Sequence, residues 1–197
     1  MVTTIDPKLF TVAEYLAYDD GTDTHYELVD GKLLEMPPSI RLHRKIAKFL
    51  EACFEREIER LKQEREVGRG EVGVRTKKQN GKDTVRQPDV VVFNRESASD
   101  LNEVDVLESV PLLAIEIVSK GPNNRKRDYE TKRQEYQNLG IPEYWIVDPE
   151  KQKVTILVLD EVAKFYEQQE YRGSAQISSF TFPELILTVD QVLGIAK

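Results

Sequence analysis

Two carboxylates interrupt otherwise apolar runs of the sequence. Glu116 is the only charged residue in LLAIEIVS (112–119), and Asp89 stands between Pro88 and the apolar run VVVF. Burying a lone carboxylate costs several kcal/mol, so each group needs a cation, a metal ion or a proton. On adjacent strands the two could share a divalent cation, and their oxygen ligands suit Mg²⁺ or Mn²⁺. Two alternatives stay open: Asp89 as a turn residue at a strand start, and Glu116 as part of a structural ion pair.

A lysine on the next helix could complete this site. Lys132 lies on a stripe of the helix predicted over 125–139 that otherwise carries aromatic and aliphatic side chains. Glu116 lies about 10 Å before the end of its strand at Ser119, and Lys132 lies about 10 Å beyond the start of the helix. Because the helix runs back antiparallel over the strand, we expect both side chains at one level. Alternatively, Lys132 extends its ammonium group to solvent or pairs with Asp128.

Asp, Glu and Lys on one sheet suit the hydrolysis of a phosphodiester. The carboxylates would hold a metal ion that activates water, and the lysine would orient that water or stabilise the charge developing on phosphorus. The sequence has no Walker loop and no nucleophile elbow, and its two histidines, His25 and His43, cannot form an all-histidine zinc site. Cys53 is the only cysteine, which excludes an intramolecular disulfide and a cysteine-based zinc site.

Length and composition predict a folded protein with one domain over 1–197, because 197 residues with 40% hydrophobic content can bury a sizeable core. No apolar run approaches the ~20 residues that span a bilayer, so we expect no membrane association. The first residues lack the basic region and apolar core of a signal peptide, and the single cysteine suits a reducing compartment. We therefore expect a cytoplasmic protein.

The charge is unevenly distributed. The net charge of −7 argues against whole-surface binding to nucleic acid. However, residues 1–35 hold eight acidic and two basic residues, and residues 143–197 hold nine acidic and five basic ones, which leaves +3 for the middle of the chain. That middle part contains two basic clusters, Arg75, Lys77, Lys78, Lys82 and Arg86, and then Lys120, Arg125, Lys126, Arg127, Lys132 and Arg133. They are either solvated surfaces or the walls of a groove for a polyanion.

Hydrophobic patterns predict the elements that position these residues. HYELVDGKLLEM alternates around an Asp-Gly dipeptide and predicts a hairpin over 25–36. A long amphipathic helix is predicted from Ile40 to about Glu66, with Ser39 as its cap and two glycines, at 68 and 70, as its end.

The remaining patterns predict a mixed sheet. Strands are predicted over 71–77, 88–93, 112–119, 143–148, 153–160 and 164–172, with a helix over 125–139 and a short helical end. The strands on either side of that helix should be parallel, with a right-handed crossover. The fold class is thus α/β (α+β), with a core over about 40–148 in the order helix, strand, strand, strand, helix, strand, and a hairpin flanking it at each end.

The segments YELVDGKLLEM, PDVVVF, LLAIEIVS and GIPEYWIVDP, together with His43, Asp128 and Lys132, resemble the bacterial restriction-endonuclease-like family of the PD-(D/E)XK phosphodiesterase superfamily. The resemblance extends from about Phe10 to Ile195, and GIPEYWIVDP is its most specific part. It implies the restriction-endonuclease-like fold, whose core order of elements is the one predicted above.

The resemblance also implies roles for the candidate residues. Asp89 and Glu116 would be catalytic carboxylates and metal ligands, with the backbone carbonyl of Ile117 as a third ligand. The superfamily lysine is expected two residues after the glutamate, where this chain has Val118. Lys132 would replace it, because a lysine relocated to the following helix is a known variation in the superfamily.

Four further positions complete the candidates: Glu27, His43, Asp128 and Ser119. Glu27 and His43 match positions in the family pattern. Glu27 could reach the metal ion as an additional acid. His43 could be a phosphate-side residue or a core histidine with its hydrogen bonds satisfied, and we favour the core interpretation.

These expectations describe a phosphodiesterase that depends on Mg²⁺ or Mn²⁺, a DNA endonuclease with DNA as its partner. A homodimer is expected, because cutting both strands of a duplex needs two sites. The alternative is a catalytically inactive nuclease fold that acts as a DNA-binding or protein-interaction module, and a third interpretation gives the buried charges a purely structural role.

Overall fold

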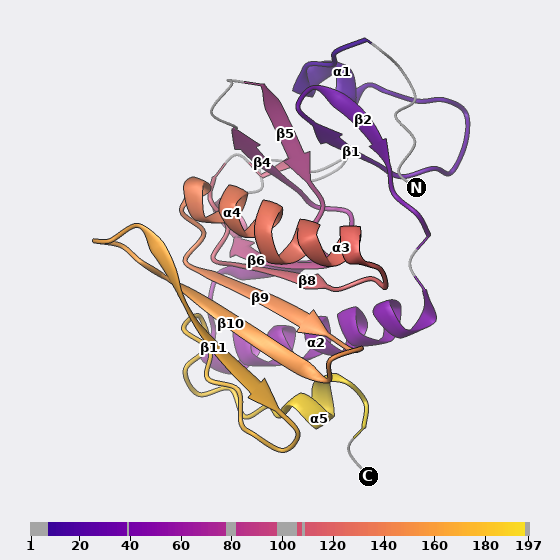
Figure 1. The fold of residues 1–197 in the computed structure, drawn as a ribbon. Helices are drawn as coiled ribbons and strands as arrows, with labels where there is room; N and C mark the ends of the chain where they lie inside the picture. The colour runs from indigo at the N-terminus through magenta and orange to yellow at the C-terminus, as the bar shows by residue number, and fades with distance from the viewer. Residues whose placement is uncertain (1–7, 39, 78–81, 98–105, 108, 196–197) are drawn as a thin grey trace.

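The computed structural model describes residues 8–38, 40–77, 82–97, 106–107 and 109–195. The strands form two sheets (Figure 1). Within these residues, the larger sheet contains, in order across it, β11 (Phe165–Arg172), β10 (Lys153–Asp160), β9 (Glu143–Asp148), β8 (Leu113–Ile117), β6 (Val90–Asn94) and β3 (Arg65–Gly68). The smaller sheet contains β2 (Lys32–Glu35), β1 (Tyr26–Val29), β5 (Asp83–Arg86), β4 (Gly73–Lys77) and β7 (Val106–Leu107).

Two long helical segments accompany the sheets. The first is α2 (Arg41–Leu61), and the second runs without a break through α3 (Pro122–Lys126), a π-helical segment η2 (Arg127–Lys132) and α4 (Arg133–Leu139). Short helices are α1 (Val12–Leu16), the 3₁₀ turn η1 (Arg95–Ser97) and α5 (Val189–Val192). In the described part of the chain, no helix is both long and apolar enough to cross a membrane.

The two long helical segments lie on opposite faces of the larger sheet (Figure 1). Strand β8 shows why, because successive side chains of a strand point to opposite faces. Ile115 and Ile117 pack into the core that α2 covers, whereas Ala114 and Val118 pack into the core that contains Tyr136 of α4. Glu116 lies between Ile115 and Ile117 in the sequence, so the same alternation turns it toward α4.

Most of the predicted strands are confirmed. The strands predicted over 88–93, 112–119, 143–148, 153–160 and 164–172 correspond to β6, β8, β9, β10 and β11. The expected parallel pairing is found between β8 and β9, with Glu116 opposite Ile146. The expected hairpin is also present, and Asp30 (φ 53°) and Gly31 (φ 74°) form its turn in the left-handed region that such turns require.

The predicted end of the first long helix was wrong. The helix α2 ends at Leu61, where Lys62 adopts a left-handed conformation with φ 51°. The following residues form β3, which pairs antiparallel with β6. Gly68 is a strand residue at a close contact, because a Cβ there would lie 2.3 Å from a side-chain carbon of Val72. The expected cap Ser39 lies outside the described residues, and the cap position, Ile40, makes no side-chain cap hydrogen bond.

The strand over 71–77 was assigned to the wrong sheet. It forms β4, which pairs with β5 and β7 in the smaller sheet, so the three core strands after α2 are β3, β6 and β8. The strand β5 was not predicted, because its sequence DTVR holds a single apolar residue. It joins the first hairpin through the pair Leu28 and Val85. The hairpin is therefore part of a second sheet, which carries Glu27 and Arg86 toward the larger one.

Candidate active site

Glu116 receives two hydrogen bonds from one helix. Nζ of Lys132 lies 2.8 Å from Oε1 of Glu116, and the hydroxyl of Tyr136 donates to the same oxygen at 2.7 Å. All three residues are buried. Lys132 ends the π-helical segment and Tyr136 lies one turn later in α4. The helix thus brings Lys132 to the level of Glu116, as the distance argument from the sequence predicts.

Asp89 stands directly before β6 and is tied to β8. Its Oδ2 accepts a 2.7 Å hydrogen bond from the backbone N–H of Ile117, the residue after Glu116. Strands β6 and β8 are antiparallel neighbours in the sheet. Asp89 is therefore more than a residue that starts a strand, because its carboxylate bridges two strands next to Glu116.

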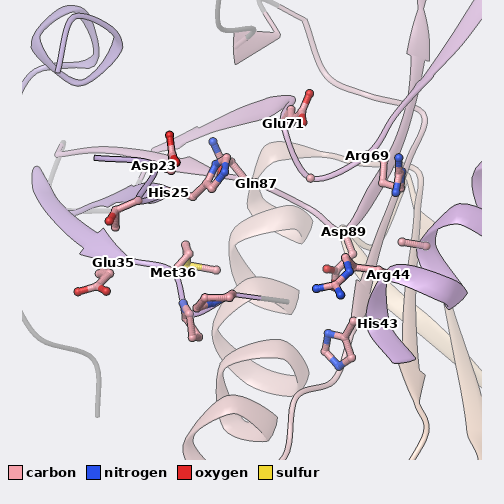
Figure 2. Close-up of a pocket in the computed structure, with 15 residues that line it drawn as sticks. Asp23, His25, Glu35, Met36, His43, Arg44, Arg69, Glu71, Gln87 and Asp89 are labelled. Carbon is pink, nitrogen blue, oxygen red and sulfur yellow. The ribbon is translucent and has the colours of Figure 1, made fainter. Parts of the chain in front are cut away.

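A cleft in two adjoining parts reaches these carboxylates. The larger part, of about 490 Å³, is bordered by the segment after β2, the start of α2 and the residues after β3. The smaller part, of about 290 Å³, is lined by Glu116 and by residues that follow β8. Asp89 and His43 line both parts. Figure 2 shows Asp89 beside His43 and Arg44 of α2, with Met36 on the opposite side of the cleft.

A second group of charges holds Lys132 from the smaller sheet. Nζ of Lys132 lies 3.1 Å from Oε1 of Glu27, which also accepts the backbone N–H of Gln87. Arg86 donates to Oε2 of Glu27 at 2.9 Å and forms two bonds, of 2.7 and 2.9 Å, with Glu135. Both oxygens of Glu27 are thus in use, and it lines neither part of the cleft. The structure places Glu27 behind Lys132, where it orients the lysine.

The surroundings give the two acids that contact Lys132 opposite pKa shifts. Burial raises the pKa of Glu116 to about 8, against the opposing effect of Lys132. Burial would also raise the pKa of Glu27, but Lys132 and Arg86 outweigh it and hold that pKa at about 2. Burial would lower the pKa of Lys132, yet Glu116 and Glu27 raise it overall. Glu27 and Lys132 are therefore the stable ion pair, and Glu116 is the carboxyl whose charge is incompletely balanced.

The oxygen atoms at the inner end of the cleft fit a hard divalent cation. Burial raises the pKa of Asp89 as it does that of Glu116, so positive charge near these two carboxyls would stabilise their ionised forms. Within the described residues, no three His, Cys, Asp or Glu side chains are grouped so that they could hold a metal ion. Mg²⁺ commonly uses one or two carboxylates and keeps several waters. Asp89 and Glu116, which both line the smaller part of the cleft, provide two carboxylates of that kind.

The other candidates lie around this site with different contacts. His43 is buried, and its Nε2 lies 3.3 Å from the carbonyl oxygen of Val118, yet it also lines the cleft. Ser119 lines the smaller part of the cleft. Asp128 is fully buried and accepts a 2.9 Å hydrogen bond from Nε of Arg127. Among the described residues, the Asp128 carboxylate bonds to Arg127, and Lys132 contacts Glu116 and Glu27 instead.

Some charged residues of the site were not identified from the sequence. Arg86 and Glu135 lie 49 residues apart in the sequence, so no local spacing indicates their contact. Arg86 was counted in a basic cluster, although it is buried and paired. Other members of the two clusters are also paired, as Arg75 is with Asp83. Lys120 and Arg127 of the second cluster line the smaller part of the cleft, whereas Lys78 of the first cluster lies outside the described residues.

Comparisons with known proteins agree with this fold. A crystal structure described as a putative nuclease, from Anabaena variabilis, matches with a TM-score of 0.71 and 18% sequence identity, over 94% of this chain and 98% of that chain. At this identity the likeness concerns the fold. No curated protein matches the chain. A family model described as "Putative restriction endonuclease" matches residues 12–190. Because that match covers most of the sequence, the chain belongs to this family, named Uma2.

Proposed function

We propose that the protein is a divalent-metal-dependent phosphodiesterase that cleaves DNA internally. The observation that carries this proposal is the 2.8 Å contact between Lys132 and Glu116 at a cleft that Asp89 also lines. Two carboxyls that line a cleft, with a buried cation in contact with one of them, suit the stabilisation of negative charge on phosphorus. Membership of the family described as "Putative restriction endonuclease" supports the same reaction and DNA as the substrate.

Asp89 and Glu116 would hold the metal ion, with the backbone carbonyl of Ile117. When bound, such an ion polarises a phosphate oxygen and lowers the pKa of a coordinated water. Asp89 is oriented by the N–H of Ile117, and Glu116 by the hydroxyl of Tyr136. Both carboxylates therefore have fixed positions before any ligand arrives, which lowers the reorganisation that the reaction requires.

Lys132 would act on the attacking water or on the phosphate. Its pKa is raised above the usual value by the carboxylates of Glu116 and Glu27, which outweigh its burial, so it stays protonated at neutral pH. An ammonium group has three donors, and contacts with Glu27 and Glu116 occupy two. Lys132 is buried and lines neither part of the cleft, so the third would donate to a water or a phosphate oxygen that comes in beside Glu116. Lys132 thus takes the role of the lysine that Val118 replaces in the strand.

A plasmid-nicking assay tests this proposal. We expect the wild type to relax supercoiled DNA with Mg²⁺ or Mn²⁺ but not with EDTA, and Glu116→Gln to lose this activity. The control is Glu71→Gln, because Glu71 is exposed and lines only the larger part of the cleft. If the wild type and Glu116→Gln nick DNA alike, the proposed enzyme is wrong.

In an alternative function, the fold binds DNA without cutting it and the buried charges are structural. The contacts of buried Lys132 with both Glu27 and Glu116 favour this alternative. DNA binding that weakens steeply with salt, with no dependence on a divalent metal ion, would support that alternative. Calorimetry separates the purely structural role, because a folded Glu116→Gln variant would then bind Mn²⁺ as the wild type does.

We also propose that the active form is a homodimer, since cleavage of both strands of a duplex requires two sites. Sedimentation of the protein with and without duplex DNA measures its mass. A monomer under both conditions that still makes double-strand breaks at single encounters would contradict the dimer.

A further inference from the structure

The π-helical segment changes which side chains of the second long helix face the site. Arg127 and Lys132 are its first and last residues. Residues five apart in an α-helix are separated by about 140° around the axis. A π-helix bonds residue i to residue i+5, so it brings such a pair to nearly the same side. Accordingly, Lys132 contacts Glu116 while Arg127 lines the smaller part of the cleft.

Asp128 orients Arg127. An α-helix would place Asp128 one turn from Lys132, where the two could pair. In the π-helical segment the carboxylate instead accepts Nε of Arg127 at 2.9 Å. Asp128 itself is fully buried, and its backbone carbonyl accepts the hydroxyl of Tyr144 at 2.9 Å. The guanidinium group is thus held from behind by a carboxylate that has little freedom to move.

The terminal nitrogens of Arg127 remain available to a ligand. Within the described residues, the side chain of Arg127 makes one hydrogen bond, through Nε, and its two NH₂ groups make none. The side chain is 20% exposed, and it borders the same cleft as Asp89 and Glu116. Burial would lower its pKa, but the charge of Asp128 outweighs that effect and raises it, so the group is a permanent cation.

Stability alone does not explain Asp128. One of its oxygens, Oδ2, is buried with no hydrogen-bond partner among the described residues. A half-satisfied buried carboxylate costs free energy that an apolar side chain would avoid. Its one side-chain bond orients a cation at the cleft, and this indicates a role in ligand binding.

We infer that Arg127 binds a phosphate of the substrate backbone next to the scissile bond, with Asp128 as its positioning residue. The inference rests on the proposed phosphodiesterase function and names a further substrate contact for it. The two NH₂ groups of an arginine match two phosphate oxygens, and a guanidinium oriented in advance loses less entropy on binding. Neither residue takes part in bond making. Substitution of either residue should therefore change the affinity for the substrate and not the rate of the chemical step.

The test measures binding of a short duplex DNA to the full chain in EDTA, where no cleavage occurs. For Arg127→Met we expect affinity to fall about tenfold and the slope of log K against log salt to decrease by about 0.9, because one phosphate contact is lost. The matched control is Lys126→Met, which removes the same charge from an exposed neighbour that lines neither part of the cleft. It should leave the affinity near that of the wild type.

A second variant serves as the control for folding. Arg127→Met leaves Asp128 buried without its partner, so the double variant Arg127→Met/Asp128→Asn removes that charge and should melt like the wild type while still binding DNA weakly. In nicking assays Asp128→Ala should raise KM with little change in kcat, and Asp128→Asn, which keeps an acceptor, should recover most of the loss.

The outcomes separate this inference from the proposed function. Nicking and DNA binding that survive Arg127→Met unchanged, or an equal loss in Lys126→Met, overturn the inference and leave the enzyme intact. Arg127-dependent binding by a wild type that never nicks DNA supports the phosphate contact and overturns the hydrolysis. A wild type that does not bind duplex DNA overturns the inference.

Discussion

Nζ of Lys132 lies 2.8 Å from Oε1 of Glu116, although the two residues come from different elements of the fold. The contact depends on β8 turning Glu116 toward the helix and on the helix returning over the sheet. It puts a lysine beside the glutamate even though the strand position two residues later holds Val118. The helix can therefore place an ammonium group beside this glutamate in a chain whose strand carries no lysine.

Replacing Lys132 should separate its chemical role from its structural one. In Lys132→Met the nicking rate should fall by at least about 100-fold, because the donor to the water or phosphate is lost. The protein should also be destabilised, because Glu27 loses a buried partner. The double variant Lys132→Met/Glu27→Gln should recover stability in thermal denaturation but not the nicking rate. Recovery of both would mean that Lys132 only balances charge.

Metal binding should require both carboxylates. Titration with Mn²⁺, followed by electron paramagnetic resonance, should show a bound ion in the wild type and at least about a tenfold weaker affinity in Asp89→Asn, since a single carboxylate would remain. Glu71→Gln is the control, because Glu71 lies at the cleft but not beside Glu116. Unchanged affinity in Asp89→Asn would remove Asp89 from the metal site.

The ion pair of Glu27 should make stability depend on pH in acid. Its folded pKa of about 2 lies below the ordinary value of 4.5, because Lys132 and Arg86 outweigh the effect of burial. The stabilisation is therefore complete above about pH 4.5 and is lost as the pH falls toward 2. The shift corresponds to about 3 kcal/mol. Urea denaturation at several pH values should show a shallower acid loss for Glu27→Gln than for the wild type.

A surface glutamate serves as the control for this pH test. Glu167 is exposed on β11, so Glu167→Gln should keep the wild-type pH dependence. An acid loss in Glu27→Gln as steep as in the wild type would assign the effect to other carboxyls.

The fold was predictable where strands carry long apolar runs. The strands β6, β8 and β9 are almost entirely buried, so most of their residues are aliphatic or aromatic. Glu116 is the one charged residue inside these runs, since Glu143 and Asp148 stand at the two ends of β9. Strands β3 and β5 have four residues each and few apolar ones. Pairing with neighbouring strands, and not their own hydrophobic patterns, determines that these segments form strands. The end of α2 was missed because Lys62, a non-glycine residue, adopts the left-handed conformation there.

The candidate site was predictable in part for a related reason. Asp89 and Glu116 are conspicuous because charges interrupt apolar runs, and Lys132 follows from the geometry of one strand and one helix. Arg86 lies in a polar segment where a charge is unremarkable, and its partners come from a hairpin and a distant helix. The alternative pair of Lys132 with Asp128 is not found among the described residues, because Asp128 lies in the π-helical segment and bonds to its neighbour Arg127.

Arg86 should be the most costly of these charges to remove. It is 2% exposed and bonds to Glu27 and Glu135, so Arg86→Met removes the guanidinium group that joins two buried carboxylates. Breaking a buried pair in this way costs about 3–5 kcal/mol of unfolding free energy. Arg75→Met on the adjacent strand β4 is the matched control, because its pair with Asp83 is exposed and is worth at most about 1 kcal/mol. Urea denaturation monitored by the fluorescence of Trp145 measures both, and equal losses would mean that the buried pair adds no more than a surface one.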